Sequence, residues 1–179
     1  MPRAGIALGS NLGDRRANLR AAFGCLGKIA TPGAPLLAAP IYQTEPLLCP
    51  PGSPYFYNSA VEIGFEGTAF ELLEITQGIE RKLGRQIAFV RNAPRIIDVD
   101  LLYFGDEVID SGWLVLPHPR IAERRFVLQP LAAIRPGLVL PGDERNISQL
   151  LDDLKSDEPP LIPVSGMGLP PQGAMPGNP

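Results

Sequence analysis

The order and periodicity of the apolar segments predict an α+β fold with the element order β-α-β-β-α-β. Three observations support this prediction: a short apolar run that leads into an amphipathic helix, a second helix that begins with a capping box, and a third apolar run that contains two acidic residues. At 179 residues, of which 45% are hydrophobic, the chain is long enough for one well-buried core.

The first part of the chain supplies a strand, a helix and two further strands. Residues 4–9 are predicted to form a buried strand, and a turn at 10–14 leads into a helix with Leu19, Ala22, Phe23 and Leu26 on its inner face. The glycines of this turn match neither the Walker nor the dinucleotide-binding pattern, so we expect the turn to be structural. Strands are expected over 36–42 and 57–65. The proline-rich loop between them, residues 44–54, has a length typical of loops that cover a site.

The second helix is predicted from its N-terminal cap. Thr68 and Glu71 have the spacing of a capping box, and Gly84 stands where a helix would end. The predicted buried stripe is Ala69, Leu72, Leu73, Thr76, Ile79 and Leu83. Gln77 and Glu80 lie on the more polar side, where a solvated face is enough to explain them.

The remaining elements complete a ferredoxin-like, split βαβ plan. A strand over 98–104 is followed by a glycine turn, residues 107–109 as its hairpin partner, and a helix over 125–134 that Pro130 interrupts. We expect an antiparallel sheet with helices on one face and active-site loops at the other. Residues 1–155 are expected to form the domain. Residues 156–179 are rich in proline and glycine, so we expect a flexible tail without helix or strand.

Composition argues against several classes of partner. A net charge of −3 and a pI of about 5.2 disfavour nucleic-acid binding. The two cysteines have no spacing suited to zinc or redox chemistry, and no long apolar segment or signal peptide is evident. We therefore expect a cytoplasmic monomer that binds small molecules and neither nucleic acid nor membrane.

Two acidic residues interrupt the apolar run near residue 100. Side chains alternate faces along a strand, so Asp98 and Asp100 point to one side while Val99 points to the other. Neighbouring carboxylates repel each other unless a cation offsets the charge, and carboxylate oxygens suit Mg²⁺, which takes its other ligands from water and phosphate. Four arginines precede the pair and would bind the same polyanion: Arg81, Arg85, Arg91 and Arg95.

A solvated strand edge would explain the two aspartates without a metal. The flanking apolar residues and the clustered arginines favour a metal site for a phosphorylated ligand. From the residues alone both interpretations remain open.

Short motifs in a fixed order resemble those of a known family. They are Gly-Ser-Asn-Leu at 9–12, Tyr-Gln-Thr-Glu-Pro at 42–46, Asn-Ser-Ala-Val at 58–61, Pro-Arg-Ile-Ile-Asp-Val-Asp at 94–100, Phe-Gly at 104–105, Pro-His-Pro-Arg at 117–120 and Arg-Arg-Phe at 124–126. Each is weak alone, but Pro-Arg-x-x-Asp-x-Asp followed by Pro-His, five residues and Arg-x-Phe is specific. On these motifs the chain resembles 6-hydroxymethyl-7,8-dihydropterin pyrophosphokinase of folate biosynthesis.

The resemblance implies transfer of diphosphate from ATP to the hydroxymethyl group of a reduced pterin, with release of AMP. It implies that Asp98 and Asp100 hold two Mg²⁺ ions, that Arg85 and Arg95 assist the transfer, and that Asp100 is a candidate proton acceptor. The implied ATP-binding residues are Gln77, Glu80, Arg85, Arg91, Arg95, His118 and Arg124. The implied pterin-binding residues are Thr44, Pro46, Leu47, Phe56, Asn58 and Phe126.

Some of these residues have simpler explanations, and some positions depart from the best-known members. His118 alone would be a packed turn residue, and Phe56 and Phe126 alone would be core residues. The resemblance instead implies that His118 donates a hydrogen bond to a phosphate and that the two phenylalanine rings stack on opposite faces of the pterin. The departures are Ile87, Asn92 and Trp113, which stand where those members have an arginine, a tryptophan and a basic residue. Either fewer phosphate contacts or contacts supplied by neighbouring loops are therefore expected. The loops at 44–54 and 85–93 are expected to close over nucleotide.

Two alternatives from other classes remain. Ferredoxin-like domains also sense small ligands or bind RNA, although the acidic pI and the lack of a basic aromatic signature count against RNA. Nucleotidyl transfer would use the same metal site. Release of AMP rather than pyrophosphate separates diphosphate transfer from nucleotidyl transfer.

Overall fold

The computed structural model describes residues 1–46, 51–84, 94–156 and 158–168, the last four of these by their backbone only. Its centre is an antiparallel sheet with the strand order β5-β1-β4-β3-β8, and a short strand β2 pairs with β4. The strands are β1 (Arg3–Ser10), β2 (Leu37–Ala38), β3 (Pro40–Thr44), β4 (Phe56–Gly64), β5 (Asp98–Phe104) and β8 (Pro163–Gly168). The predicted β-α-β-β-α-β order and α+β class are confirmed.

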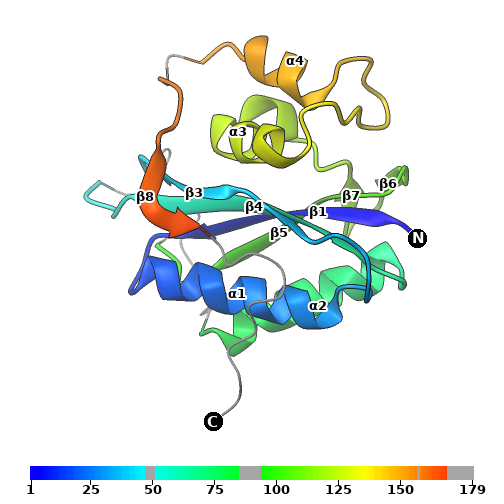
Figure 1. Ribbon diagram of the computed structural model, residues 1–179, viewed down its shortest axis with the longest axis horizontal. Coiled ribbons are helices and arrows are strands. Elements are labelled where there is room, and N and C mark those ends of the chain that lie inside the picture. Colours follow the sequence, from blue (N-terminus) through cyan, green and yellow to red (C-terminus); the bar gives the residue numbers. More distant parts are fainter. Residues whose placement is uncertain (47–50, 85–93, 157, 169–179) are drawn as a thin grey trace.

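Helices lie on both faces of the sheet (Figure 1). α1 (Arg15–Ile29) and α2 (Ala69–Lys82) cover one face, while α3 (Arg125–Ile134) and α4 (Ile147–Asp152) lie over the other. The expectation that helices occupy one face only is therefore wrong. A separate apolar cluster under α3 and α4, which includes Leu102, Leu128 and Leu150, explains why this second face is covered.

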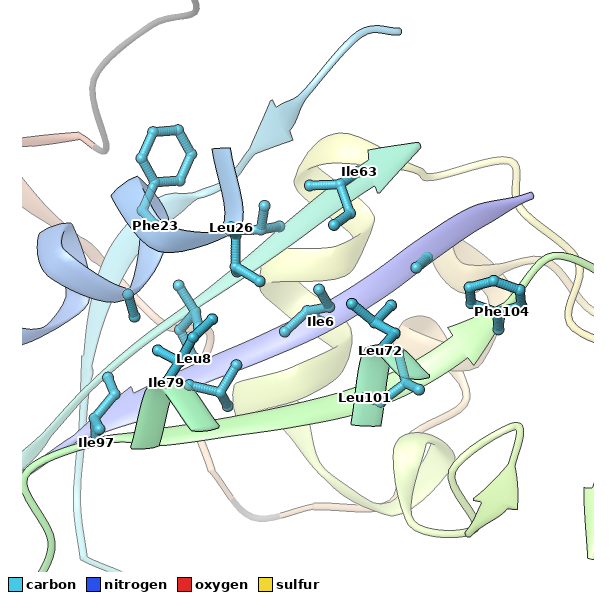
Figure 2. Close-up of a cluster of buried hydrophobic side chains, with 14 of the residues drawn as sticks. Ile6, Leu8, Phe23, Leu26, Ile63, Leu72, Ile79, Ile97, Leu101 and Phe104 are labelled. Atoms are coloured by element: carbon cyan, nitrogen blue, oxygen red, sulfur yellow. The ribbon is translucent and has the colours of Figure 1, made fainter. Parts of the chain in front are cut away.

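The larger core lies between the sheet and the first pair of helices (Figure 2). The buried side chains Leu19, Phe23 and Leu26 of α1 were predicted for this face, and they meet Ile6 and Leu8 of β1. In α2 the predicted capping box is present: the Glu71 amide donates to Thr68 Oγ1 (3.2 Å), and the Thr68 amide donates to Glu71 Oε2 (2.7 Å).

Between β5 and α3 the chain departs from the predicted hairpin. Gly105 has a positive φ of 53° and the amide of Glu107 donates to the carbonyl of Phe104 (3.0 Å), which closes a tight turn. Residue 109 pairs with Leu116, so β6 (Ile109–Asp110) pairs with β7 (Val115–Leu116) and not with β5. A 3₁₀ turn, Ile121–Glu123, precedes α3, which continues through Pro130 without interruption.

The C-terminal segment contains a strand that the composition did not predict. β8 pairs antiparallel with β3, so the expectation that no residue after 155 forms a strand is wrong for Pro163–Gly168. In an edge strand only alternate backbone amides donate to the neighbouring strand. Proline and glycine can therefore occur in such a strand without preventing its pairing. The domain boundary at residue 155 and the flexibility of the tail remain predictions.

Candidate active site

One row of side chains crosses the sheet where β1 ends. Gly9 is opposite Asn58 of β4 on one side and opposite Asp98 of β5 on the other. Opposed residues of neighbouring strands project to the same face. A methyl group added at Gly9 would lie 2.9 Å from Asn58 Oδ1 and 3.9 Å from both Asp98 Cβ and Phe56 Cδ1. A side chain at Gly9 would therefore crowd Asn58, and the bare backbone of Gly9 lets the predicted pterin side adjoin the predicted metal side.

This row lies on the same sheet face that α3 covers further along. Further along the same face, the strands carry Ala7 two residues before Gly9, Ala60 two residues after Asn58 and Leu102 four residues after Asp98, and these residues belong to or pack against the cluster under α3. The row itself extends past that cover. The sheet thus supplies a floor and the first turn of α3 one wall of the candidate site.

The carboxylates of Asp98 and Asp100 stand at the start of β5. Asp98 is partly buried and Asp100 is exposed. Arg95 Nη1 lies 2.9 Å from Asp98 Oδ2 and 3.2 Å from Oδ1, so one guanidinium nitrogen contacts both oxygens. Within the described ranges, no group of three or more acidic, histidine or cysteine side chains is placed to hold a metal. Two carboxylates fit Mg²⁺, which commonly takes only one or two from the protein.

The β1–α1 turn fixes the segment that leads into these carboxylates. The amide of Arg95 donates to Asn11 Oδ1 (2.8 Å), and the amide of Asn11 donates to the Arg95 carbonyl (3.2 Å). Asn18 Nδ2 donates to the carbonyl of Ile96 (3.1 Å). The structural role predicted for this turn is confirmed. The positioning role of Asn11 and Asn18 was not predicted, although Asn11 belongs to the Gly-Ser-Asn-Leu motif.

Glu80 is buried, which corrects the interpretation of its helix side as a solvated face. Its Oε1 accepts from the Val99 amide at 2.9 Å, between the two aspartates on β5. β5 lies at the edge of the sheet, so this carboxylate satisfies an amide that faces outward. Gln77 on the preceding turn is exposed. Direct ATP contacts by Gln77 and Glu80 stay predictions.

Two backbone hydrogen bonds hold His118. Its amide donates to the Leu102 carbonyl of β5 (2.7 Å), and its Nδ1 accepts from the Arg120 amide (3.1 Å). Burial lowers the pKa of His118, while the nearby Asp100 carboxylate raises it in part. A neutral ring with Nδ1 accepting carries its proton on Nε2. His118 therefore presents an N–H donor near Asp100.

Arg124 begins α3 beside the same carboxylates. Burial lowers its pKa, as does Arg120, and the Asp100 and Asp98 carboxylates act in the opposite direction. The guanidinium carbon lies 5.5 Å from the centroid of the Phe126 ring. Phe126 is partly buried against the cluster under α3. The first turn of α3 thus places a cation and an aromatic ring over the acidic end of the row.

Thr44, Pro46, Phe56 and Asn58, four of the predicted pterin residues, lie toward the other end of the row, whereas Phe126 lies on α3. Asn58 is buried, and its Nδ2 donates to Thr44 Oγ1 at 2.6 Å. Phe56 is opposite Thr44 and projects to the same face as Asn58. Pro46 follows two residues later and is partly buried. The contact between Phe56 and Phe126 across a bound pterin stays a prediction.

Several predicted residues fall outside the described part of the chain. These are Leu47, Arg85, Ile87, Arg91 and Asn92, together with the rest of the 85–93 loop. Closure of the two loops over nucleotide therefore stays a prediction. The third departure, Trp113, is 87% exposed at the turn between β6 and β7. In the described ranges, every helix is too short or too polar to cross a bilayer.

Comparisons with known proteins agree with this arrangement. Residues 5–136 match the family model described as 7,8-dihydro-6-hydroxymethylpterin-pyrophosphokinase (HPPK). The chain is 47% identical over 129 residues to the 2-amino-4-hydroxy-6-hydroxymethyldihydropteridine pyrophosphokinase of Bacillus subtilis, covering 72% of this chain and 75% of that protein. It is 41% identical over 143 residues to the corresponding enzyme of Methylorubrum extorquens, covering 80% of this chain and 89% of that one.

Solved structures extend the likeness to the fold. A crystal structure of wild-type Plasmodium falciparum HPPK-DHPS with SDX-DHP superposes with a TM-score of 0.66 at 14% identity, covering 84% of this chain. The present chain spans 44% of that longer protein. The chain belongs to the 7,8-dihydro-6-hydroxymethylpterin-pyrophosphokinase family, enzymes that transfer pyrophosphate from ATP to hydroxymethyldihydropterin in folate synthesis.

Proposed function

We propose that this chain carries out the family reaction at the row of side chains centred on Gly9, with Mg²⁺ held by Asp98 and Asp100. The observation that carries the proposal is the position of Gly9 between Asn58 and Asp98, with no side chain of its own to separate them. A hydroxyl attacking a phosphorus atom must approach it closely, and catalysis of phosphoryl transfer rests largely on such alignment.

The acidic end of the row is the nucleotide half. Asp98 and Asp100 would hold Mg²⁺ there, and the metal would neutralise charge on the triphosphate. The hydrogen-bond donors around the carboxylates would serve the same polyanion: Arg95 beside Asp98, Arg124 at the start of α3, and the ring N–H of the neutral His118. Arg95 must share Asp98 with the metal or leave it for phosphate, because its Nη1 contacts both carboxylate oxygens. Arg85, Arg91, Gln77 and Glu80 complete the proposed ATP-binding set.

The amide end of the row is the pterin half. Asn58 donates to Thr44, which fixes the orientation of its amide and leaves Oδ1 beside Gly9 as an acceptor for the N–H edge of a heterocycle. Phe56 and Phe126 would pack on the two faces of the flat ring, and Pro46 and Leu47 would contribute backbone groups. A pterin bound in this way directs its hydroxymethyl group toward Asp98 and Asp100.

The bond changes follow from this placement. The pterin hydroxyl oxygen forms a bond to the β-phosphorus, the bond between that phosphorus and the oxygen bridging it to the α-phosphate breaks, and AMP leaves with the bridging oxygen. The hydroxyl proton must be accepted, and Asp100, the more exposed of the two carboxylates on β5, is the candidate for that role.

The test is product identification. Purified chain is incubated with ATP, Mg²⁺ and 6-hydroxymethyl-7,8-dihydropterin, and nucleotides and pterins are separated by chromatography. The expected products are AMP and the pterin diphosphate in equal amounts. Pyrophosphate in place of AMP would indicate nucleotidyl transfer instead, and no consumption of ATP would overturn the proposal.

We further propose that the protein works as a cytoplasmic monomer. The net charge of −3 and the absence of a paired cysteine motif in the sequence support a small-molecule enzyme in a reducing compartment. Sedimentation at micromolar concentration should give a species near the chain mass of 19.3 kDa. A species of twice that mass would contradict the monomer.

A further inference from the structure

The segment that follows α4 holds β3 in the sheet. β8 pairs with β3 antiparallel, with Pro163 opposite Tyr42 and Gly168 opposite Pro40. On its other side β3 pairs with β4, with Tyr42 opposite Asn58. The strand that ends at Thr44 is therefore held from both sides. β8 lies beyond residues 5–136, the part of the chain that matches the family model.

The same segment is tied to α3 through one side chain. Gln129 Nε2 donates to the Leu161 carbonyl (2.6 Å), and Gln129 Oε1 accepts from the Leu161 amide (2.8 Å). Residues three apart on a helix are neighbours on its surface, so Gln129 lies next to Phe126. The reciprocal pair therefore anchors the part of α3 that carries the predicted pterin-stacking ring.

A third contact reaches the opposite layer of the fold. Val164 is partly buried against the core between the sheet and α1 and α2. In Figure 1 the segment runs from α4 past the end of α3 to the edge of the sheet, where β8 lies beside β3. Residues 158–168 thus form a strap, defined here by that range, which contacts α3, β3 and the core beneath the sheet.

We propose that this strap positions the pterin half of the active site. Thr44 ends β3 and Phe126 lies in the first turn of α3, so two walls of the proposed pterin site belong to different layers. The strap contacts both elements. The nucleotide half is fixed by other contacts, namely Asn11 and Asn18 to the 95–96 backbone and Glu80 to β5. The inference rests on the proposed function, and Gln129 acts as a positioning residue.

Two truncations of the full chain test the strap as a whole. A chain ending at Pro160 loses β8 and Leu161, and a control chain ending at Gly168 keeps both. Loss of the strap should raise the KM for the pterin about fivefold, the scale of one or two net hydrogen bonds, and leave the KM for ATP within about twofold. The control should match the full chain. Equal KM values for the pterin in both truncations would overturn the inference.

Variants of Gln129 test the anchor without shortening the chain. Gln129→Met keeps the side-chain length and removes both hydrogen bonds to Leu161, whereas Gln129→Glu keeps the acceptor for the Leu161 amide. The methionine variant should raise the pterin KM about threefold, with the glutamate variant between it and the full chain. A fall in thermal stability with an unchanged pterin KM would show a merely structural role.

These experiments separate the inference from the proposed function. If the full-length chain forms no AMP from ATP and the pterin, the proposed function fails. If the full-length chain is active and Gln129→Met binds the pterin as tightly as the full chain, only the role of the strap is overturned. Should the chain ending at Pro160 fail to fold, the Gln129→Met result decides.

Discussion

Two carboxylate sites lie at opposite ends of one sheet face, and they differ in burial and in their partners within the protein. Glu62 of β4 is fully buried; Arg3 lies 2.8 Å from Oε1, Arg135 lies 3.4 Å from Oε2, and the Tyr103 hydroxyl donates to Oε2. At the other end Asp98 is partly buried and Asp100 is exposed. The internal partners of Glu62 come from β1, β5 and the end of α3, which ties three elements together.

The difference shows which end of the sheet is available to a ligand. Glu62 lies four residues after Asn58 on the same strand, so it shares the face of the active-site row at a distance of roughly 13 Å. A buried carboxylate must be paired within the protein, and this one is. A carboxylate at an open end can take its partners from metal and substrate. A carboxylate on a sheet face therefore indicates a ligand-binding site only where it is accessible at the end of its strand.

The two glycines of β1, Gly5 and Gly9, also differ in what lies over them. A methyl group added at Gly5 would overlap the ring of Tyr103, which packs over that glycine and reaches Glu62. A methyl group added at Gly9 would instead meet Asn58 Oδ1 at 2.9 Å. At Gly5 the space is filled by the protein's own side chain. At Gly9 we propose that it is kept for substrates.

The largest expected effect is a loss of activity when Asp98 or Asp100, at the acidic end of the row, is replaced. Asp98→Asn or Asp100→Asn should lower AMP formation about a thousandfold or more, because the ligand charge that holds the metal is lost. The exposed Asp100 makes few packing contacts, so its variant should unfold at nearly the same temperature. Asp110→Asn, on the exposed side of β6, is the matched control. Activity within tenfold of the unchanged chain would remove these residues from the site.

At the opposite end of the sheet face, substitution of Glu62 should change the stability of the fold and not the activity. Glu62→Gln leaves Arg3 and Arg135 without their shared carboxylate, and we expect it to lower the free energy of unfolding by about 3 kcal/mol. Urea titration measures this loss. At low temperature the folded variant should keep its kcat and both KM values within about twofold. A selective change in kcat with unchanged stability would place Glu62 in the catalytic machinery.

Alanine variants of Gly5 and Gly9 should affect different properties, the stability of the fold and the binding of the pterin. Gly5→Ala should destabilise the fold by about 2 kcal/mol, because Tyr103 must move. Gly9→Ala should displace Asn58 from Thr44 and raise the KM for the pterin about tenfold with a smaller change in stability. Unfolding curves and steady-state kinetics on both variants provide the test. Equal effects of both changes on the pterin KM would contradict the assignment of Gly9.

The smallest expected effect concerns pH. Burial lowers the pKa of His118 in the folded state, so the unfolded chain takes up this proton first as pH falls. Stability should therefore decline as pH drops through the ordinary histidine range near 6.5 and level off below the lowered pKa. His118→Gln should flatten this part of the stability profile. An unchanged profile would show that another group titrates.

Local patterns in the sequence were sufficient for most of the fold. The capping box of Thr68 and Glu71, the apolar stripe of α1 and the shared face of Asp98 and Asp100 each depend on residues a few positions apart. These predictions needed no knowledge of tertiary contacts.

Features that depend on distant partners were missed. Glu62 lay inside an apolar run, and its partners are far away in sequence. Glu80 resembled a solvated helix residue because its partner, the Val99 amide, lies 19 positions later. The strand β8 depends on pairing with β3, which composition cannot reveal. The nearness of Asn58 to Asp98 likewise follows only from the register across Gly9.

Metal-dependent nucleotide binding tests directly whether Asp98 and Asp100 hold Mg²⁺. Calorimetric titration with a non-hydrolysable ATP analogue, with and without Mg²⁺, is compared between the unchanged chain and Asp100→Asn. Mg²⁺ should tighten binding of the analogue to the unchanged chain at least about tenfold, and this gain should be lost in the variant. An equal gain from Mg²⁺ in both proteins would contradict the claim that this end of the sheet holds the metal.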